Sequence, residues 1–294
     1  MSGKYDSKFD PTNNLDPLSI LNKEIVSDST VLEFGPANGR FTKSLHNAKN
    51  CTVDIVEFDE KSGKDATKFA RNSLIGLKDG NIENYKWELA YADYQYDYIV
   101  FADVLEHLRN PQKALEEASK LLKEQGKILL SIPNVAHNAV LMALIEDDFP
   151  YRPTGLLDNT HIHFFTKKTI AAMLNNIDLN IYKFSAIIVS PPSTEFHDNY
   201  ARFPKIIADM FKLRPNGEAY QYVIVCGKEA SYEKQDASSK TEEDFSAFFD
   251  YANKLADVTG QLMECQRKCE TYENSHSWKI TAPLRKLVEK WKNL

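Results

Sequence analysis

The sequence is poor in cysteine and contains no long apolar run. Its four cysteines, Cys51, Cys226, Cys265 and Cys269, show neither a C-x-x-C pair nor a spacing typical of a disulfide framework. No window approaches the roughly 18 to 20 apolar residues of a transmembrane helix. The polar stretch 1–16 lacks an apolar signal core. We therefore expect a reduced, cytoplasmic protein.

An excess of basic residues is also missing. The net charge of -6 argues against general nucleic-acid binding, which requires a basic surface. With 43% hydrophobic residues, a chain of 294 residues can bury the core of one large domain, with or without an appendage.

What the sequence does contain is a glycine turn between a strand-like and a helix-like segment, at residues 31–42. The turn carries the pattern Glu33-x-Gly35-x-x-x-Gly39. Glycine lets the backbone approach a ligand closely, and the N–H groups at the start of a helix attract polar or anionic groups. This arrangement predicts a nucleotide-binding turn, although the glycines could also serve close helix–strand packing.

A second strand-like segment, 52–58, ends on the acid Glu57, and Asp59 follows it. In doubly wound sheets an acid at this place accepts hydrogen bonds from both ribose hydroxyls. We assign this role to Glu57, with Asp59 as the alternative. A dinucleotide site would need G-x-G-x-x-G, whereas this turn has Ala37 at the middle position. The spacing favours S-adenosylmethionine (SAM), a nucleoside ligand without a pyrophosphate.

Further segments strengthen this interpretation because they resemble, in order, the motifs of class I SAM-dependent methyltransferases. After the two segments above come Gly80-Asn81-Ile82-Glu83, an L-E-H-L turn within 96–108, and a helix–glycine–strand segment at 121–134. The resemblance covers approximately 15–228. It implies an α/β, Rossmann-like, doubly wound sheet of seven mostly parallel strands, with an antiparallel last strand and helices on both faces.

The resemblance also implies that SAM lies across the ends of the first, second and fourth strands. Asn81 stands where the family usually has an acid, and His107 could instead cap or pack its helix. The residues assigned to the cofactor are Glu33, Gly35, Pro36, Gly39, Glu57, Phe58, Asn81, Ile82, Ala102, Asp103 and His107.

The acceptor side is assigned to His161 and His163, in a segment similar to one near the substrate in related methyltransferases. A neutral imidazole can take a proton from a sugar or phenol hydroxyl, so we predict a catalytic base here. A hydrogen bond that merely fixes the loop is the alternative. Two histidines at i and i+2 could also chelate a metal, but no third ligand with convincing spacing is visible, and we predict no metal site.

Two strand-like runs, 179–189 and 219–226, match the final antiparallel hairpin of the family. The segment between them, 190–217, is too long for a turn and predicts a loop plus a helix. We interpret it as a lid over the substrate or, alternatively, as surface decoration.

The composition changes after the predicted methyltransferase domain, 1–229. Residues 230–244 are polar and predict a linker. Within 245–274 apolar residues alternate spacings of three and four, which favours a coiled coil or a helix that packs on its own domain.

The last segment, 275–294, begins with a motif that resembles the ends of many bacterial glycan-assembly enzymes. It continues as a basic amphipathic helix. Such a helix could lie in a membrane interface, dock on a partner protein, or be purely structural.

Together these features predict a SAM-dependent methyltransferase that O-methylates a sugar or related group in cell-surface glycan biosynthesis. The alternatives are a small-molecule O-methyltransferase acting on a phenol or quinone, or a SAM-binding scaffold of a glycan-assembly complex. The expected partners are a glycan or small-molecule acceptor and, through the tail, a glycan-assembly protein or a second copy. We expect no nucleic acid, and we place the protein in the cytoplasm, with peripheral contact at the inner face of the membrane as an option.

Overall fold

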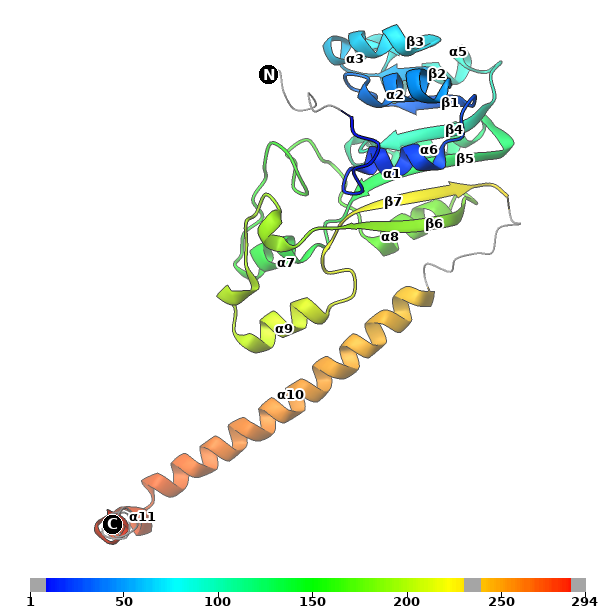
Figure 1. Cartoon of the computed structure of the whole chain (residues 1–294). Coiled ribbons are helices and arrows are strands. Elements are labelled where there is room, and N and C mark those ends of the chain that lie inside the picture. The colour runs from blue at the N-terminus through cyan, green and yellow to red at the C-terminus, as the bar shows by residue number, and fades with distance from the viewer. Residues whose placement is uncertain (1–8, 230–238, 287–294) are drawn as a thin grey trace. The chain divides into compact units, whose positions relative to one another are not determined.

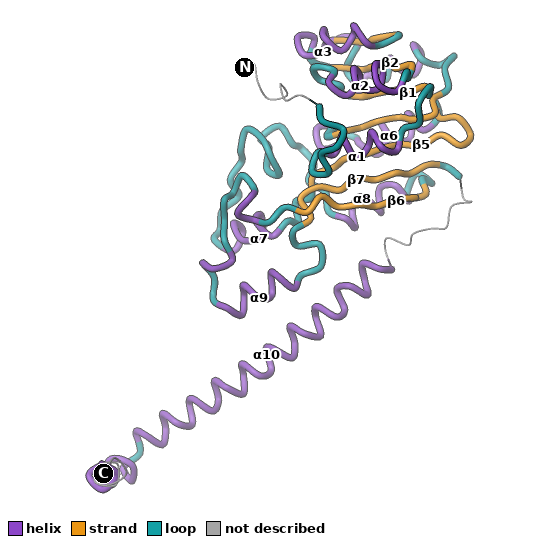
Figure 2. Tube along the Cα trace, in the orientation of Figure 1, coloured by secondary structure: helices purple, strands orange, loops and turns teal. Residues whose placement is uncertain are grey.

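A computed structural model of the chain describes residues 9–229 and 239–286. The chain divides into two units, the first ending at Thr241 and the second beginning at Glu242. The first unit is an α/β domain and the second is helical (Figures 1 and 2).

The first unit is built on a sheet of seven strands in the order β3-β2-β1-β4-β5-β7-β6. All neighbouring pairs from β3 to β5 are parallel, whereas β7 runs antiparallel to both β5 and β6. The predicted seven-stranded sheet with an antiparallel last strand is therefore confirmed. The strands are β1 (Thr30–Phe34), β2 (Thr52–Glu57), β3 (Asn72–Ile75), β4 (Tyr96–Ala102), β5 (Leu122–Pro133), β6 (Asn180–Ile188) and β7 (Ala219–Gly227).

Helices cover both faces of the sheet because successive strand side chains point to opposite sides. Val31 of β1 packs in one apolar cluster with residues of α1, α2 and α3, and its neighbour Leu32 packs in another with residues of α5, α6 and α8. The helices of this unit are α1 (Pro17–Glu24), α2 (Arg40–Lys49), α3 (Glu60–Ala66), α4 (Gly76–Asp79), α5 (Lys86–Ala90), α6 (Pro111–Ser119), α7 (Asn138–Ile145), α8 (Lys167–Asn175) and α9 (Lys205–Leu213). Short 3-10 turns are η1 (Thr67–Phe69), η2 (Ile82–Asn84), η3 (Leu105–His107), η4 (Pro191–Ser193) and η5 (Tyr200–Arg202).

Residues 60–74 do not form one continuous helix. Helix α3 ends at Ala66, and Leu74 belongs to β3, a four-residue strand that pairs with β2. Such a short edge strand has too few residues to show an alternating pattern. Residues 72–75 form a strand because they pair with β2, and this pairing cannot be seen from the local sequence.

The predicted lid, 190–217, contains a loop and helix α9, as its length indicated. Asn138 at the start of α7 ties this segment to the domain. Its amide donates to the hydroxyl of Tyr200 (2.8 Å) and to the carbonyl of Phe211 (2.9 Å), and its oxygen accepts from Arg214 (2.8 Å). Figure 1 shows α7 and α9 beyond the end of the sheet toward which β4 points.

The second unit consists of α10 (Ser239–Asn274) and α11 (His276–Ile280). Residues 230–238 of the predicted linker lie outside the described residues, and 239–244 belong to α10. The end of the predicted basic helix, 287–294, also lies outside the described residues. None of the helices in the described ranges is long and apolar enough to cross a membrane.

Candidate functional site

The turn between β1 and α2 is shaped by two glycines with positive φ. Gly35 has φ 68° and Gly39 has φ 76°, a region that side chains other than glycine rarely adopt. Space is equally limiting, because a Cβ on Gly35 would lie 2.6 Å from Cγ2 of Val104. A Cβ on Gly39 would lie 2.5 Å from Cα of Ala66. The glycine pattern therefore brings the β1 turn against the segment that follows β4.

Glu57 ends β2 with its carboxylate turned toward this turn. One oxygen, Oε2, accepts from the N–H of Ala37 (2.8 Å), and Oε1 accepts from the N–H of Asp59 (2.7 Å). The residue is 8% exposed, and burial raises the pKa of its carboxyl despite these two bonds. Each carboxylate oxygen can accept more than one hydrogen bond, so Glu57 retains acceptor capacity for a ribose. Its surroundings fit the predicted role.

The alternative ribose ligand, Asp59, is engaged elsewhere. Its carboxylate caps α3 by accepting from the N–H groups of Lys61 and Ser62. Asp59 thus fixes the start of a helix, which is a sufficient reason for an acid at that position.

Three further residues assigned to the cofactor, Phe58, Asn81 and Ile82, differ in how accessible they are. Asn81 uses its side-chain oxygen to cap η2 by accepting from the N–H of Glu83 (3.0 Å). Ile82 is 7% exposed and belongs to the main apolar core. Phe58 is 55% exposed directly after Glu57, so its ring is available for stacking. Of the three, Phe58 has the surroundings that suit a contact with a flat base.

Glu33 lies inside the domain. It is 3% exposed, and its Oε2 accepts from the hydroxyl of Thr42 on α2 (2.7 Å). Burial raises the pKa of its carboxyl to about 7. The observed partner of Glu33 is thus a side chain of the fold. Pro36, the next predicted residue after Gly35, accepts from the N–H of Gly39 with its carbonyl (2.9 Å).

Ala102 and Asp103 stand at the end of β4. Asp103 has φ 55° and accepts from Ser131 (2.9 Å) and from Gln221 with the same oxygen, Oδ1. Water reaches the residue, yet the protein atoms packed around its carboxyl raise its pKa. An acid is therefore held at the carboxyl end of the central strands, where ligands bind in open α/β sheets.

His107 and His161 lie against each other although they are far apart in the sequence. Their ring centroids are 4.8 Å apart, and Nδ1 of His107 lies 3.2 Å from the carbonyl oxygen of Thr160. The hydroxyl of Thr160 lies 3.3 Å from the same nitrogen. Backbone bonds hold the two segments together, since the N–H groups of Ile162 and His163 both donate to the carbonyl of Glu106 (2.9 and 3.0 Å).

His163 faces a different partner. Its Nε2 lies 3.1 Å from the carbonyl oxygen of Arg109. The structure therefore does not bring His161 and His163 together on one ligand, and the loop contact weighed in the sequence analysis is present at His163.

Glu106 is a site residue that the sequence analysis did not single out. It is 1% exposed, and its Oε1 lies 3.9 Å from Nε2 of His161. Among the described residues no hydrogen-bond donor reaches either of its carboxylate oxygens. Burial, together with the nearby charges of Asp103 and Asp158, raises its pKa well above the usual range. The L-E-H-L motif contained Glu106, but only the folded loop at 158–163 shows that it is enclosed.

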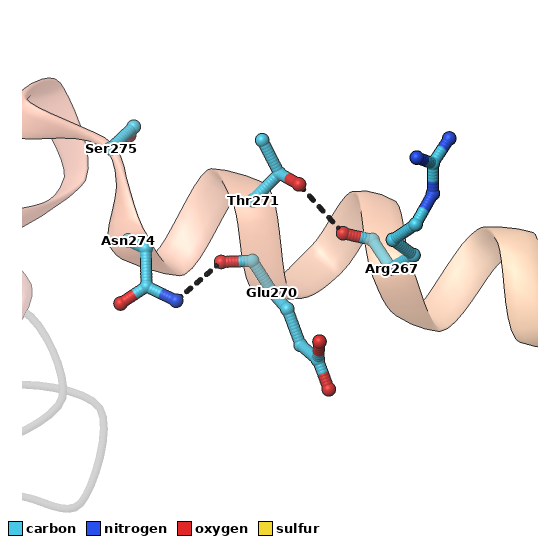
Figure 3. A pocket seen from close by; sticks show the side chains of 5 residues that line it. All are labelled: Arg267, Glu270, Thr271, Asn274 and Ser275. Carbon is cyan, nitrogen blue, oxygen red and sulfur yellow. Dashed lines mark hydrogen bonds between the residues drawn. The ribbon is translucent and has the colours of Figure 1, made fainter.

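A separate hollow lies at the end of α10, lined by Arg267, Glu270, Thr271, Asn274 and Ser275 (Figure 3). Two of its side chains bond to the helix itself, since Thr271 donates to the carbonyl of Arg267 and Asn274 to that of Glu270. It is open to solvent and none of the methyltransferase motifs contributes to it, so we assign it no function.

The fold and the glycine turn thus define a class I methyltransferase architecture. In agreement, residues 9–183 match a family model described as a methyltransferase domain, which is more than half of the chain. The chain belongs to this methyltransferase-domain family. It carries a methyltransferase domain at residues 9–183.

Several curated proteins are similar to the chain. A ubiquinone biosynthesis O-methyltransferase of Pectobacterium carotovorum is 26% identical over 72% of this chain and 83% of that protein. The mitochondrial ubiquinone biosynthesis O-methyltransferase of Dictyostelium discoideum is 22% identical over 56% of this chain. An uncharacterized protein of Methanocaldococcus jannaschii is 28% identical over 44% of it. The chain spans only 54% and 57% of the lengths of these last two relatives.

Solved methyltransferases are also similar. CcbJ of Streptomyces caelestis is 14% identical, with 77% of this chain and 94% of that chain covered and a TM-score of 0.48. The plantazolicin methyltransferase BpumL, solved in complex with SAH, is 16% identical, with 72% and 80% covered and a TM-score of 0.45.

Proposed function

We propose that the chain transfers the methyl group of SAM to a hydroxyl of a small aromatic molecule of the phenol or quinol type. A row of aromatic side chains carries this proposal. Phe164 lies 6.2 Å from the ring of His161, Phe149 lies 5.6 Å from Phe164, and Tyr151 lies 5.3 Å from Phe149. Tyr151 is 61% exposed, so the row leads from His161 to solvent. Edge-to-face contacts of this kind suit an aromatic acceptor.

SAM supplies an electrophilic methyl group on a sulfonium. The residues that would hold it are Glu57 for the ribose, Phe58 for the adenine face, and the backbone of Gly35 and Gly39 for the methionine part. The residues present fit this assignment, because Glu57 has acceptor capacity for the ribose.

The acceptor side would be formed by the segment 158–166, which is hydrogen-bonded to η3 directly after β4. This segment places His161 beside the end of the strand that carries Asp103. The chain would act chiefly by holding the acceptor oxygen in line with the methyl group. His161 or His163 would take the hydroxyl proton as predicted from the sequence.

This proposal and the glycan hypothesis differ in the molecule that receives the methyl group. The tail motif supports a glycan acceptor, whereas the names of the relatives described above refer to ubiquinone biosynthesis. The aromatic row agrees with the latter. The scaffold hypothesis requires SAM binding without turnover on any acceptor.

A transfer assay with methyl-labelled SAM tests the acceptor class. The full chain is incubated with a panel of small catechols and quinols and, in parallel, with a glycan fraction. We expect label in the small-molecule fraction and none with Glu57→Ala. Label only in the glycan fraction would overturn the proposal and restore the glycan hypothesis. SAM binding without label in either fraction would instead favour a scaffold.

A further inference from the structure

Among the described residues, the carboxylate of Glu106 is buried with neither of its oxygens hydrogen-bonded. A charge or polar atom that leaves water needs hydrogen bonds or an opposite charge in return. In the described chain, both oxygens of Glu106 lack a hydrogen-bond donor, and its ion-pair partner is His161 at 3.9 Å. Two further carboxylates, Asp103 and Asp158, act on it electrostatically. The site therefore contains a buried carboxyl group that no hydrogen-bond donor of the described residues satisfies.

Two imidazoles complete the set. One ligand atom each from Glu106, His107 and His161 lie within 4.8 Å of one another. Around a cation with ligand bonds of about 2.1 Å, neighbouring donor atoms are about 3 to 4 Å apart. The ligand atoms that lie farthest apart thus need to approach by about 1 to 2 Å for the three side chains to share one ion.

The surroundings of His107 match those of a metal-bound imidazole. Such rings typically donate their second N–H to a backbone carbonyl or a carboxylate, which orients the ring. His107 has such a contact with the carbonyl of Thr160 at 3.2 Å. Thr160 is itself held, because its N–H and hydroxyl both donate to Asp158 (2.9 and 2.6 Å). Asp158 therefore braces the loop that supplies His161.

We propose that Glu106, His107 and His161 bind one divalent transition-metal ion, of the Zn²⁺ or Co²⁺ type. Two imidazoles and one carboxylate are a set that holds zinc in catalytic sites, with positions left for water or substrate. The hard all-oxygen coordination that Mg²⁺ and Ca²⁺ prefer is not what these residues offer.

The ion would act on the acceptor. A cation lowers the pKa of a hydroxyl brought against it, and the released proton passes to solvent water. An imidazole bound to the ion has no lone pair for that proton. Binding of the ion would therefore exclude His161 from the role of base named above, and His161 would orient the acceptor through the ion. This role rests on the proposed function, whereas the site itself does not.

A titration with Co²⁺ tests the site directly. The full chain is used with Cys265→Ser and Cys269→Ser, because these exposed cysteines, four residues apart on α10, could bind the ion themselves. We expect about one Co²⁺ per chain, visible d–d absorption without a thiolate band, and displacement by Zn²⁺, whose affinity is generally higher. No stoichiometric binding would overturn the proposal.

Variants locate the ion. Glu106→Gln and His161→Gln should each weaken Co²⁺ binding by at least about tenfold, the lower end of losses seen when even outer partners of a metal site are changed. His163→Gln is the matched control, because His163 lies on the same loop but faces the carbonyl of Arg109. It should bind Co²⁺ like the parent. Equal binding by all three variants would place the ion elsewhere and overturn the proposal.

Glu106 is buried, so its variant could fail to fold, and a measurement on the parent covers that case. With Co²⁺ bound, proton NMR should show two strongly shifted exchangeable imidazole N–H signals, one from each histidine. Their absence from a Co²⁺-loaded parent would overturn the proposal.

The methyl-transfer assay separates the two proposals. A chelator should abolish transfer, and Zn²⁺ or Co²⁺ should restore it. Ion binding with no transfer to any acceptor would reject the proposed function alone. Transfer that persists in the chelator, together with no ion bound, would reject the metal site alone.

Discussion

The two units of the chain differ most clearly in where their apolar side chains lie. In the methyltransferase unit, Phe34 and Trp87 are fully buried and pack edge to face, 4.9 Å apart. On α10 of the second unit, Val258 is 62% exposed, Leu262 58% and Met263 64%. The first unit thus contains its own core, whereas the described part of α10 leaves apolar residues in water.

We predicted an interaction through the tail, and these exposed apolar residues lie in it. A helix with an uncovered apolar stripe gains most of its stability from what packs on the stripe. The coiled coil predicted at 245–274 would supply that partner as a second helix. The three-and-four spacing that predicted it falls on residues that are exposed in the described part of α10, including Leu262 and Tyr272. The occupant of the stripe stays a prediction.

The largest expected effect comes from a cavity in the first unit. Phe34→Ala removes a ring that stacks on Phe101 at 4.4 Å and should lower the free energy of unfolding by about 3–5 kcal/mol. Leu262→Ala, the matched change on α10, should alter it by less than about 0.5 kcal/mol, as surface substitutions do. Denaturant unfolding of the first unit measures both. Similar losses from the two variants would contradict the contrast between the units.

The next effect is a pH dependence of Glu33. Its pKa in the folded state is raised to about 7, so the folded state holds the proton more tightly than the unfolded state. Its contribution to stability is complete below its usual pKa of 4.5 and falls as the pH rises through about 7. Glu33→Gln keeps an oxygen that accepts from Thr42 but has no proton to lose, so its stability should not fall over this pH range. Relative to the parent, it should gain about 3 kcal/mol of unfolding free energy between pH 4.5 and about 8.

Glu264 on α10 is the control for that measurement. It pairs with Lys268 at 2.8 Å on an exposed helix face, where such pairs are worth about 0.3–0.5 kcal/mol. Glu264→Gln should therefore show no comparable slope with pH. A flat difference between the parent and Glu33→Gln would mean that Glu33 titrates normally in the folded state.

SAM affinity gives the third test. Glu57→Ala removes the acceptor proposed for the ribose and should weaken binding by about 1.5–3 kcal/mol, as for hydrogen bonds to a charged group. Calorimetry on the full chain measures this loss, and Asp59→Ala should leave affinity within about threefold, because Asp59 caps α3. If Asp59→Ala shows the larger loss, the ribose assignment belongs to Asp59.

The smallest expected effect is that of removing the second unit. In a chain that ends at Lys228, the free energy of unfolding of the first unit should differ by less than about 0.5 kcal/mol from its value in the full chain. The reason is that the first unit has its own core. Transfer to small aromatic acceptors should be unchanged, while any self-association should be lost. Equilibrium unfolding, the labelled-SAM assay and sedimentation measure the three. A large drop in stability would show that the units depend on each other.

Local rules predicted several features of the first unit correctly. Thr166 caps α8 in a reciprocal arrangement with Thr169, which depends only on residues of the first helical turn. The two glycines were expected to form a turn between a strand and a helix, and both have positive φ there. Their contact with a ligand stays a prediction. These features depend on a few neighbouring residues, which is why a sequence displays them. Strand pairings between distant residues could not be predicted in this way, as the pairing of β3 with β2 shows.

The sequence by itself determined the class of protein, because the glycine turn, the acid after the second strand and the ordered later motifs occur together in one chain. Only the tertiary structure decided which of two histidines turns toward Glu106 and that Glu106 is enclosed. The physical reason is that burial and the meeting of η3 with the loop at 158–163 arise from contacts more than fifty residues apart. Spacing along the chain does not encode such contacts, whereas it does encode a turn that needs glycine.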